Sequence, residues 1–176
     1  MTAHTETATP TFNARERSMD FSRISTEGIV AGLIGAVTVA FWFFILDAIQ
    51  GRPLYTPTVL GTALFGDASA RDAPERIQAS FETALMFTWV HVLAFAILGG
   101  VAAYLLMLAE RDPNYGFGIL LFFVVFMFGF LVVAMAFAES VLHALAWPAI
   151  LVGNVLAAAA MALYFRRHHP NLVIRP

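Results

Sequence analysis

Four long runs of apolar residues constrain the fold of this 176-residue chain more than any other feature. A helix rises about 1.5 Å per residue, so roughly 20 apolar residues are needed to cross a hydrocarbon core about 30 Å thick. The runs cover residues 28–46, 84–109, 117–138 and 148–165. They occupy nearly half of the chain and leave no room for a separate soluble domain. The sequence therefore predicts an all-α integral membrane protein, built as an antiparallel bundle of four transmembrane helices.

The composition agrees with this class and excludes several others. Charged residues make up 12% of the chain, whereas soluble domains contain about 25%. The net charge of −2 does not provide the basic surface that nucleic-acid binding requires, so nucleic acid is not an expected partner. The chain has no Cys, which excludes disulfides, thiolate metal sites and cysteine nucleophiles.

The arginines near the ends of the apolar runs predict the orientation of the bundle, because cytoplasmic loops carry an excess of basic residues. Seven of the ten basic residues fall on one side of the predicted membrane and three on the other. The seven are Arg15, Arg17, Arg23, Arg111, Arg166, Arg167 and Arg175, and the three are Arg52, Arg71 and Arg76. Both termini are therefore expected in the cytoplasm. The absence of Lys suits a GC-rich bacterial genome, and we expect a bacterial-type inner membrane.

The chain divides into three regions by this interpretation. Residues 1–27 form a cytoplasmic tail rich in Thr, Ala and charge, which should be ordered only when a partner binds it. Residues 28–167 form the transmembrane domain, and residues 168–176 form a C-terminal tail. Ser25 or Thr26 is the predicted N-cap of the first helix.

The longest connection, residues 51–82, contains a short apolar segment at Thr58–Phe65. This segment cannot span a bilayer, so we expect it in the outer interface or folded back over the mouth of the bundle. It could equally cover helix ends or act as a lid over a site. The sequence Asp72–Glu75 combines a cap residue, an early proline and an acid, which predicts that the second long helix begins near residue 73.

Small residues recur in these runs at the spacings that let helices approach closely. We expect them to serve packing within the bundle rather than a dimer interface. The pairs are Gly28 with Gly32, Gly99 with Gly100, and Gly153 with Ala157.

Five polar residues lie within or beside the spans and are the candidate site residues: Asp47, His91, Glu139, His143 and Asn154. Polar groups in a membrane are costly and therefore point to function. Counting residues from the outer end of each run places His91 and Asn154 both about 10 Å below the outer boundary. These two are the candidate cofactor-binding residues. Asp47 and Glu139 fall near the boundary, and His143 lies above it.

Glu139 and His143 are four residues apart, the spacing at which a carboxylate and an imidazole on one helical face share a metal ion or a proton. With Asp47 they form the candidate metal site, although a closed site needs about four ligands. In the alternative interpretation, the carboxylate and imidazole bond to each other or pair with Arg52 or Arg76 of the outer loop.

Haem or a chlorophyll-type pigment is the alternative cofactor for His91. Two His ligands to one haem must lie at the same depth, but His91 and His143 differ by about 18 Å in straight helices. Phe87 and Phe95 flank His91 one turn away, where a tetrapyrrole ring against the helix would favour small residues. Without a cofactor, His91 would be a buried imidazole bonded to Asn154 or to a backbone carbonyl.

The sequence contains no Ser-His-Asp order, Gly-rich phosphate loop, HExxH or paired catalytic acids, so no catalytic residue is assigned and an enzyme is not expected. The leading hypothesis is a non-enzymatic membrane subunit that packs against a larger respiratory or photosynthetic complex. Its partners are the lipid bilayer and other membrane proteins, and the sequence assigns it no cofactor, with haem, a chlorophyll-type pigment or a metal ion as the alternatives. The alternative is a small haem- or metal-binding protein that transfers electrons or protons at the outer face, and the third is an oligomeric small transporter.

Overall fold

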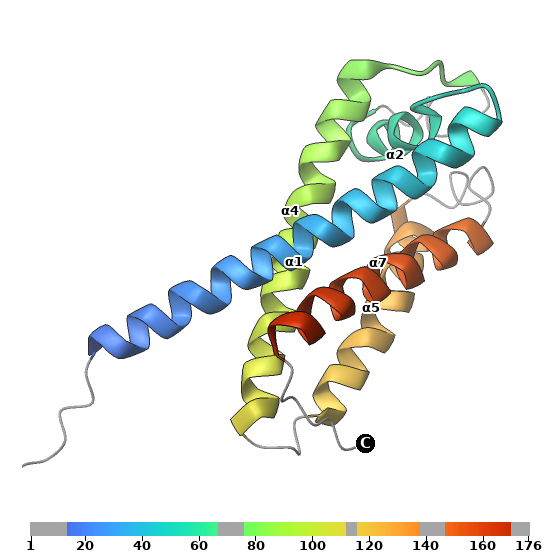
Figure 1. The fold of residues 1–176 in the computed structure, drawn as a ribbon. Helices are drawn as coiled ribbons and strands as arrows, with labels where there is room; N and C mark the ends of the chain where they lie inside the picture. Colours follow the sequence, from blue (N-terminus) through green and yellow to red (C-terminus); the bar gives the residue numbers. More distant parts are fainter. Residues whose placement is uncertain (1–13, 67–75, 112–115, 138–146, 170–176) are drawn as a thin grey trace, which may run out of the picture.

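The computed structural model describes residues 14–66, 76–111, 116–137 and 147–169, and this part of the chain is helical without any strand (Figure 1). The helices in chain order are α1 (Ala14–Ile49), α2 (Tyr55–Phe65), α4 (Phe81–Arg111), α5 (Gly116–Phe137) and α7 (Trp147–His168).

Three of these helices are long and apolar enough to cross a membrane. The segments are Ser22–Ile49 in α1, Phe81–Glu110 in α4 and Pro148–His168 in α7. The described residues are thus all-helical, as predicted, with three candidate membrane-spanning helices that suggest a membrane protein. Helix α5 covers residues 117–137 of the third predicted span, and Phe117–Phe126 is its apolar stretch among the fully described residues. A fourth crossing, the antiparallel bundle and the cytoplasmic termini therefore stay predictions.

Glycines bring the backbones of α1 and α4 into direct contact. A Cβ atom built on Gly28 would lie 2.6 Å from the Cα of Gly100, and one built on Gly32 would lie 2.8 Å from the Cα of Ala96. Both distances are too short for a real side chain, so these positions need glycine. The predicted small-residue contact is thus found inside the bundle, where it holds α1 against α4.

The main apolar core lies between α1, α4 and α7. Its buried residues are Ala31, Ala36, Val39, Phe95, Ala103, Leu106, Ala157, Met161 and Phe165. Trp42 links α1 to the start of α7, because its indole N–H donates to the Ala149 carbonyl oxygen at 2.9 Å. Helix α5 joins this core through Phe126, which meets Phe95 edge to face at 5.8 Å.

The start of α1 differs from the prediction. The helix begins at Ala14, so Ser25 and Thr26 lie inside it and the predicted N-cap is wrong. The Thr26 hydroxyl instead donates to the Ser22 carbonyl oxygen at 2.9 Å, as hydroxyl residues inside helices do. The stretch from residue 14 to residue 27 contains no Gly or Pro, so nothing local stops the helix from extending past the apolar run.

The start of α4 also differs from the prediction. Residues 77–80 are not helical and α4 begins at Phe81, so a start near residue 73 is wrong; residues 72–75 themselves lie outside the described residues. The cap is Ser80, whose hydroxyl oxygen accepts the Thr83 backbone N–H at 3.3 Å. The Ser80 backbone in turn donates to the Thr58 hydroxyl oxygen at 3.1 Å. A tertiary contact with α2 therefore fixes this helix start.

Candidate functional site

The short apolar segment of the longest connection folds as helix α2, which packs against α4 at the end of the bundle away from His168, the last residue of α7 (Figure 1). We call this the α2 end. Thr58 and Val59 are its most buried residues. Gly61 lets the two helices approach, because a Cβ built there would lie 2.6 Å from the Thr83 carbonyl oxygen. Helix α2 is thus a fixed part of the bundle.

Asp47, near the end of α1, holds the first turn of α2. One carboxylate oxygen accepts the Thr56 backbone N–H and the other accepts the Thr56 hydroxyl, both at 2.7 Å. Asp47 is only 3% exposed. The α2 N-cap, Leu54, makes no side-chain cap bond, so a carboxylate from the preceding helix supplies the acceptor that a local cap would otherwise provide.

The chain between Asp47 and Thr56 turns through left-handed backbone conformations. Gly51 has φ +69°, which glycine adopts without steric cost, whereas Leu54 has φ 69° and ψ 12°. A branched residue in this region costs about 1–2 kcal/mol. The bonds from Thr56 to Asp47 hold the turn in place, and the Leu54 side chain lines a cavity.

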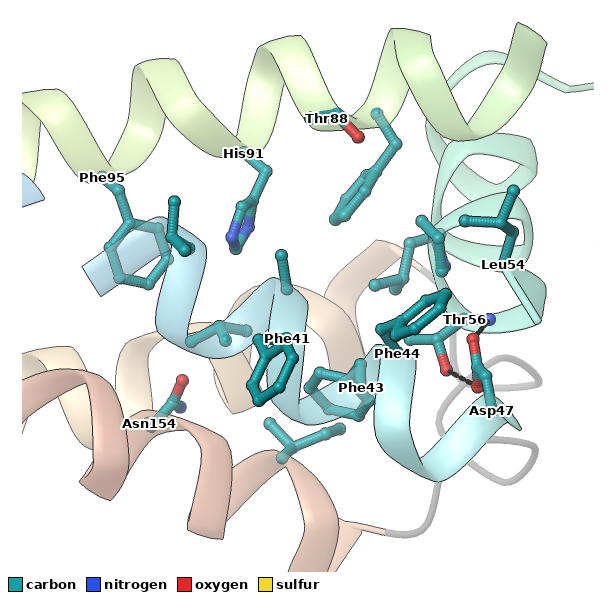
Figure 2. Close-up of a pocket in the computed structure, with 17 residues that line it drawn as sticks. Phe41, Phe43, Phe44, Asp47, Leu54, Thr56, Thr88, His91, Phe95 and Asn154 are labelled. Atoms are coloured by element: carbon teal, nitrogen blue, oxygen red, sulfur yellow. Dashed lines mark hydrogen bonds between the residues drawn. The ribbon is translucent and has the colours of Figure 1, made fainter. Parts of the chain in front are cut away.

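This cavity lies between α1, α2, α4 and α7 and has a volume of about 410 Å³ (Figure 2). Its wall is mainly apolar, with five aromatic rings. The rings belong to Phe41, Phe43, Phe44, Phe87 and Phe95, and the other apolar lining residues are Val37, Val39, Ala40, Leu54, Pro57, Leu60 and Ile150.

The cavity opens beside α1, where some of its lining residues are exposed on the surface of the protein. Val37, Phe41 and Phe44 line it and are also 66%, 63% and 48% exposed. All three belong to the membrane-spanning segment Ser22–Ile49. The opening is therefore bordered by apolar side chains at the height where α1 would meet lipid.

His91 faces this cavity from the middle of α4 (Figure 2). Its Nε2 lies 3.2 Å from the Ala36 carbonyl oxygen. Because a carbonyl can only accept, Nε2 carries the proton, and in the neutral imidazole Nδ1 is then an acceptor. Phe87 and Phe95 flank the ring, with centroids 5.7 and 4.7 Å away.

Asn154 faces the same cavity from α7. It is 8% exposed, and its Nδ2 is buried without a hydrogen-bond partner among the described residues. A buried amide N–H without an acceptor costs about 1–3 kcal/mol. This unpaired donor is the one polar feature of the described wall that points to a missing acceptor.

The cavity brings together three of the five residues singled out in the sequence: His91, Asn154 and Asp47. The other two, Glu139 and His143, lie outside the described residues. Within the described ranges, no group of three His, Asp or Glu residues is arranged to hold a metal ion. The metal, haem and pigment hypotheses are therefore neither supported nor contradicted.

A second polar cluster joins three helices at the end opposite α2, and sequence reasoning did not single it out. His169, directly after α7, places Nε2 2.8 Å from the Glu27 carboxylate of α1 and Nδ1 2.6 Å from the Glu110 carboxylate of α4. Both ring nitrogens face acceptors, which is the arrangement of a protonated imidazolium. Burial lowers the pKa of His169, but the bonds to Glu110 and the charge of Glu27 outweigh it, so the pKa is raised.

We expect this cluster to make stability depend on pH above about 6.5, the ordinary pKa of His. Because the folded-state pKa is raised, the stabilisation is fully present below the unfolded-state value and is lost as the pH rises through the folded-state value. The midpoint of thermal unfolding in detergent should therefore fall between pH 6 and pH 9. His169→Gln should lose this dependence, whereas His168→Gln, a change in the neighbouring residue, should keep it. An unaltered dependence in His169→Gln would contradict the assignment.

Comparison of the chain with protein-family models, with curated proteins and with solved structures finds no match. The geometry of the cavity and the chemistry of its wall are therefore the basis for the functional proposal.

Proposed function

We propose that this chain is a non-enzymatic integral membrane protein that holds a lipid-soluble small molecule in the cavity between α1, α2, α4 and α7. The observation that supports it is the cavity itself. Its volume of about 410 Å³ falls within the range of about 300–1,000 Å³ typical of small-molecule sites, which are also mainly apolar with few polar groups.

The polar groups on the wall support binding rather than catalysis. The two titratable side chains there, Asp47 and His91, are both engaged with the protein itself: Asp47 accepts two bonds from Thr56, and His91 donates to the Ala36 carbonyl oxygen. The hydroxyl that Asp47 accepts belongs to Thr56, whose backbone N–H binds the same carboxylate, so this pair caps α2 and is not the nucleophile, base and orienting group of a catalytic site.

The proposal includes a location. We place the α2 end at the outer face of a bacterial-type inner membrane, with both termini and the His169 cluster in the cytoplasm. The seven-to-three distribution of arginines in the sequence supports this orientation. The opening between Val37, Phe41 and Phe44 would then face the hydrocarbon of the outer leaflet, so a ligand would reach the cavity from the bilayer.

A second proposal, that the chain is an accessory subunit of a larger respiratory or photosynthetic membrane complex, is favoured by α1. Its first turns, from Ala14, project away from the other helices (Figure 1). A helical segment without packing partners is marginal in water, so a partner at this face would stabilise it. Native extraction in mild detergent should then yield a heteromeric complex. A protein that is always isolated alone and monodisperse would contradict this second proposal.

The cavity proposal is tested by filling the cavity from α1. Ala40 lines it, and Ala48 is also exposed on α1 but does not line it. We expect Ala40→Phe to lose most of the small molecule that co-purifies with the wild type, because the added ring occupies the ligand's volume. Ala48→Phe should retain it. Mass spectrometry of solvent extracts from equal amounts of each protein measures the difference.

Two results would contradict the cavity proposal. One is a wild-type protein that carries no molecule beyond the bulk lipids of the preparation. The other is an Ala40→Phe variant that carries as much as the Ala48→Phe control.

A further inference from the structure

The hydrogen bonds around the cavity indicate the chemistry of the molecule that fits it. Five lining residues are polar: Asp47, Thr56, Thr88, His91 and Asn154. A ligand in an apolar cavity is oriented by the few polar groups that remain available to it. The question is therefore which of these groups still has a free donor or acceptor.

The donors of three residues are already used. The backbone N–H and the hydroxyl of Thr56 both donate to Asp47 at 2.7 Å. The Thr88 hydroxyl donates to the Ala84 carbonyl oxygen at 2.7 Å. His91 donates from Nε2 to the backbone of α1 at 3.2 Å, which leaves its Nδ1 as an acceptor.

The donor that remains is Nδ2 of Asn154, which is buried without a partner among the described residues. Figure 2 places this amide on the α7 side of the cavity, with His91 and Phe95 on the α4 side. An amide nitrogen needs an acceptor. No described acceptor, His91 Nδ1 included, lies within hydrogen-bond distance of Nδ2, so a ligand oxygen is the group that would complete the site.

We infer that the ligand is a flat, lipid-soluble ring compound with a carbonyl oxygen, the class to which quinones belong, and that its carbonyl accepts a hydrogen bond from Asn154. The ring of such a compound packs against the phenylalanines by offset or edge-to-face contacts. Its apolar tail extends through the opening at Val37, Phe41 and Phe44. This inference rests on the proposed function and adds the ligand class to it.

The inference is tested by comparing three probes with tails of similar length. Decylubiquinone carries ring carbonyls, decylbenzene has the ring without carbonyls, and an acyclic ester has a carbonyl without the ring. Binding to the detergent-solubilised full chain is measured by ultrafiltration and quantification of the free probe. We expect the wild type to bind decylubiquinone roughly 3- to 10-fold more tightly than decylbenzene, the difference that one net hydrogen bond gives.

Variants then locate this preference on Asn154. Asn154→Leu keeps a similar volume and removes the donor, so it should weaken decylubiquinone binding by roughly the same 3- to 10-fold and leave decylbenzene binding unchanged. Thr62→Val is the matched control, because it removes a hydroxyl that lies outside the cavity lining and donates to the Thr58 carbonyl oxygen at 2.9 Å, so both affinities should be unchanged.

The outcomes separate the inference from the proposed function. If none of the three probes binds the wild type, the cavity proposal itself fails; if the ester alone binds, the cavity stands and the ring assignment is wrong. If decylubiquinone and decylbenzene bind equally, or if a folded Asn154→Leu binds decylubiquinone as tightly as the wild type, the cavity stands and the carbonyl assignment is wrong. If the acyclic ester binds as tightly as decylubiquinone, the flat ring is wrong. The comparison of probes on the wild type tests the cavity, the carbonyl and the ring even if the Asn154→Leu variant does not fold.

Discussion

Replacing Gly99 by alanine will destabilise the bundle by about 2–3 kcal/mol, the cost of overpacking a tight contact, whereas the same change at Gly100 will not. A Cβ on Gly99 would lie 2.6 Å from the backbone nitrogen of Gly32 and 2.8 Å from its Cα. Both are backbone atoms of α1, so no side-chain rotation relieves the clash. Helices α1 and α4 must therefore move apart, and the residues on either side of this glycine contact, the α1–α4 seam, lose their packing.

Gly100 is the matched control because it is the next residue in the same helix. A Cβ there would meet nothing within 4 Å, and alanine is favoured over glycine inside a helix by about 1 kcal/mol. Gly100→Ala should therefore be neutral or stabilising. Unfolding of both variants in mixed micelles, followed by circular dichroism, gives the comparison. Equal destabilisation of the two variants would show that α1 and α4 do not meet through Gly99.

Replacing Asp47 by alanine should release α2 from the end of α1 and destabilise it by about 3 kcal/mol, the upper value for hydrogen bonds to a charged group. Asp47 accepts two bonds of 2.7 Å from Thr56 and is almost fully buried. Its loss leaves two donors of Thr56 unpaired and removes the cap of α2. The turn that contains Leu54 in its left-handed conformation then loses the Thr56–Asp47 bonds that hold it in place.

Hydrogen exchange of the backbone amides of α2 is the direct measurement for this change. Exchange in Tyr55–Phe65 should accelerate in Asp47→Ala, while exchange in the α1–α4 seam should stay close to the wild type. Asp47→Asn is the control, because its side-chain oxygen can still accept the Thr56 N–H, so its effect should be smaller. Unchanged protection of α2 in Asp47→Ala would contradict the role of Asp47 as a distant cap.

The long helices could be predicted from the sequence because their apolar runs meet a simple length requirement, and α1, α4 and α7 meet it in the structure. The helix starts could not be predicted as well. Residues 14–27 lack an apolar pattern, yet they continue α1 because nothing in them breaks a helix. The start of α4 depends on the contact between Ser80 and Thr58, which lies 22 residues away in sequence and has no local signal.

The candidate site was accessible only in part from the sequence. Polar residues in apolar runs are conspicuous, and their estimated depth placed His91 and Asn154 at the same level, where both line the cavity. The partner of Asp47 is Thr56, nine residues away. Two residues between them have a left-handed backbone conformation, and no regular spacing predicts this contact. The phenylalanines of the wall do not stand out, because an apolar residue in an apolar run looks the same whether it faces lipid or a cavity.

The opening beside Val37, Phe41 and Phe44 determines which ligand concentration, in the bilayer or in water, sets the occupancy of the cavity. Occupancy of any site depends on the ratio of free ligand concentration to the dissociation constant. For a cavity that opens sideways at the height of the hydrocarbon, the relevant concentration is the mole fraction of the molecule among the surrounding lipids, not its level in water. A compound that is scarce in the aqueous phase but abundant in the bilayer would then occupy the cavity even with a modest intrinsic affinity. Titrations at several lipid-to-protein ratios should therefore collapse onto one curve only when the ligand is expressed per lipid.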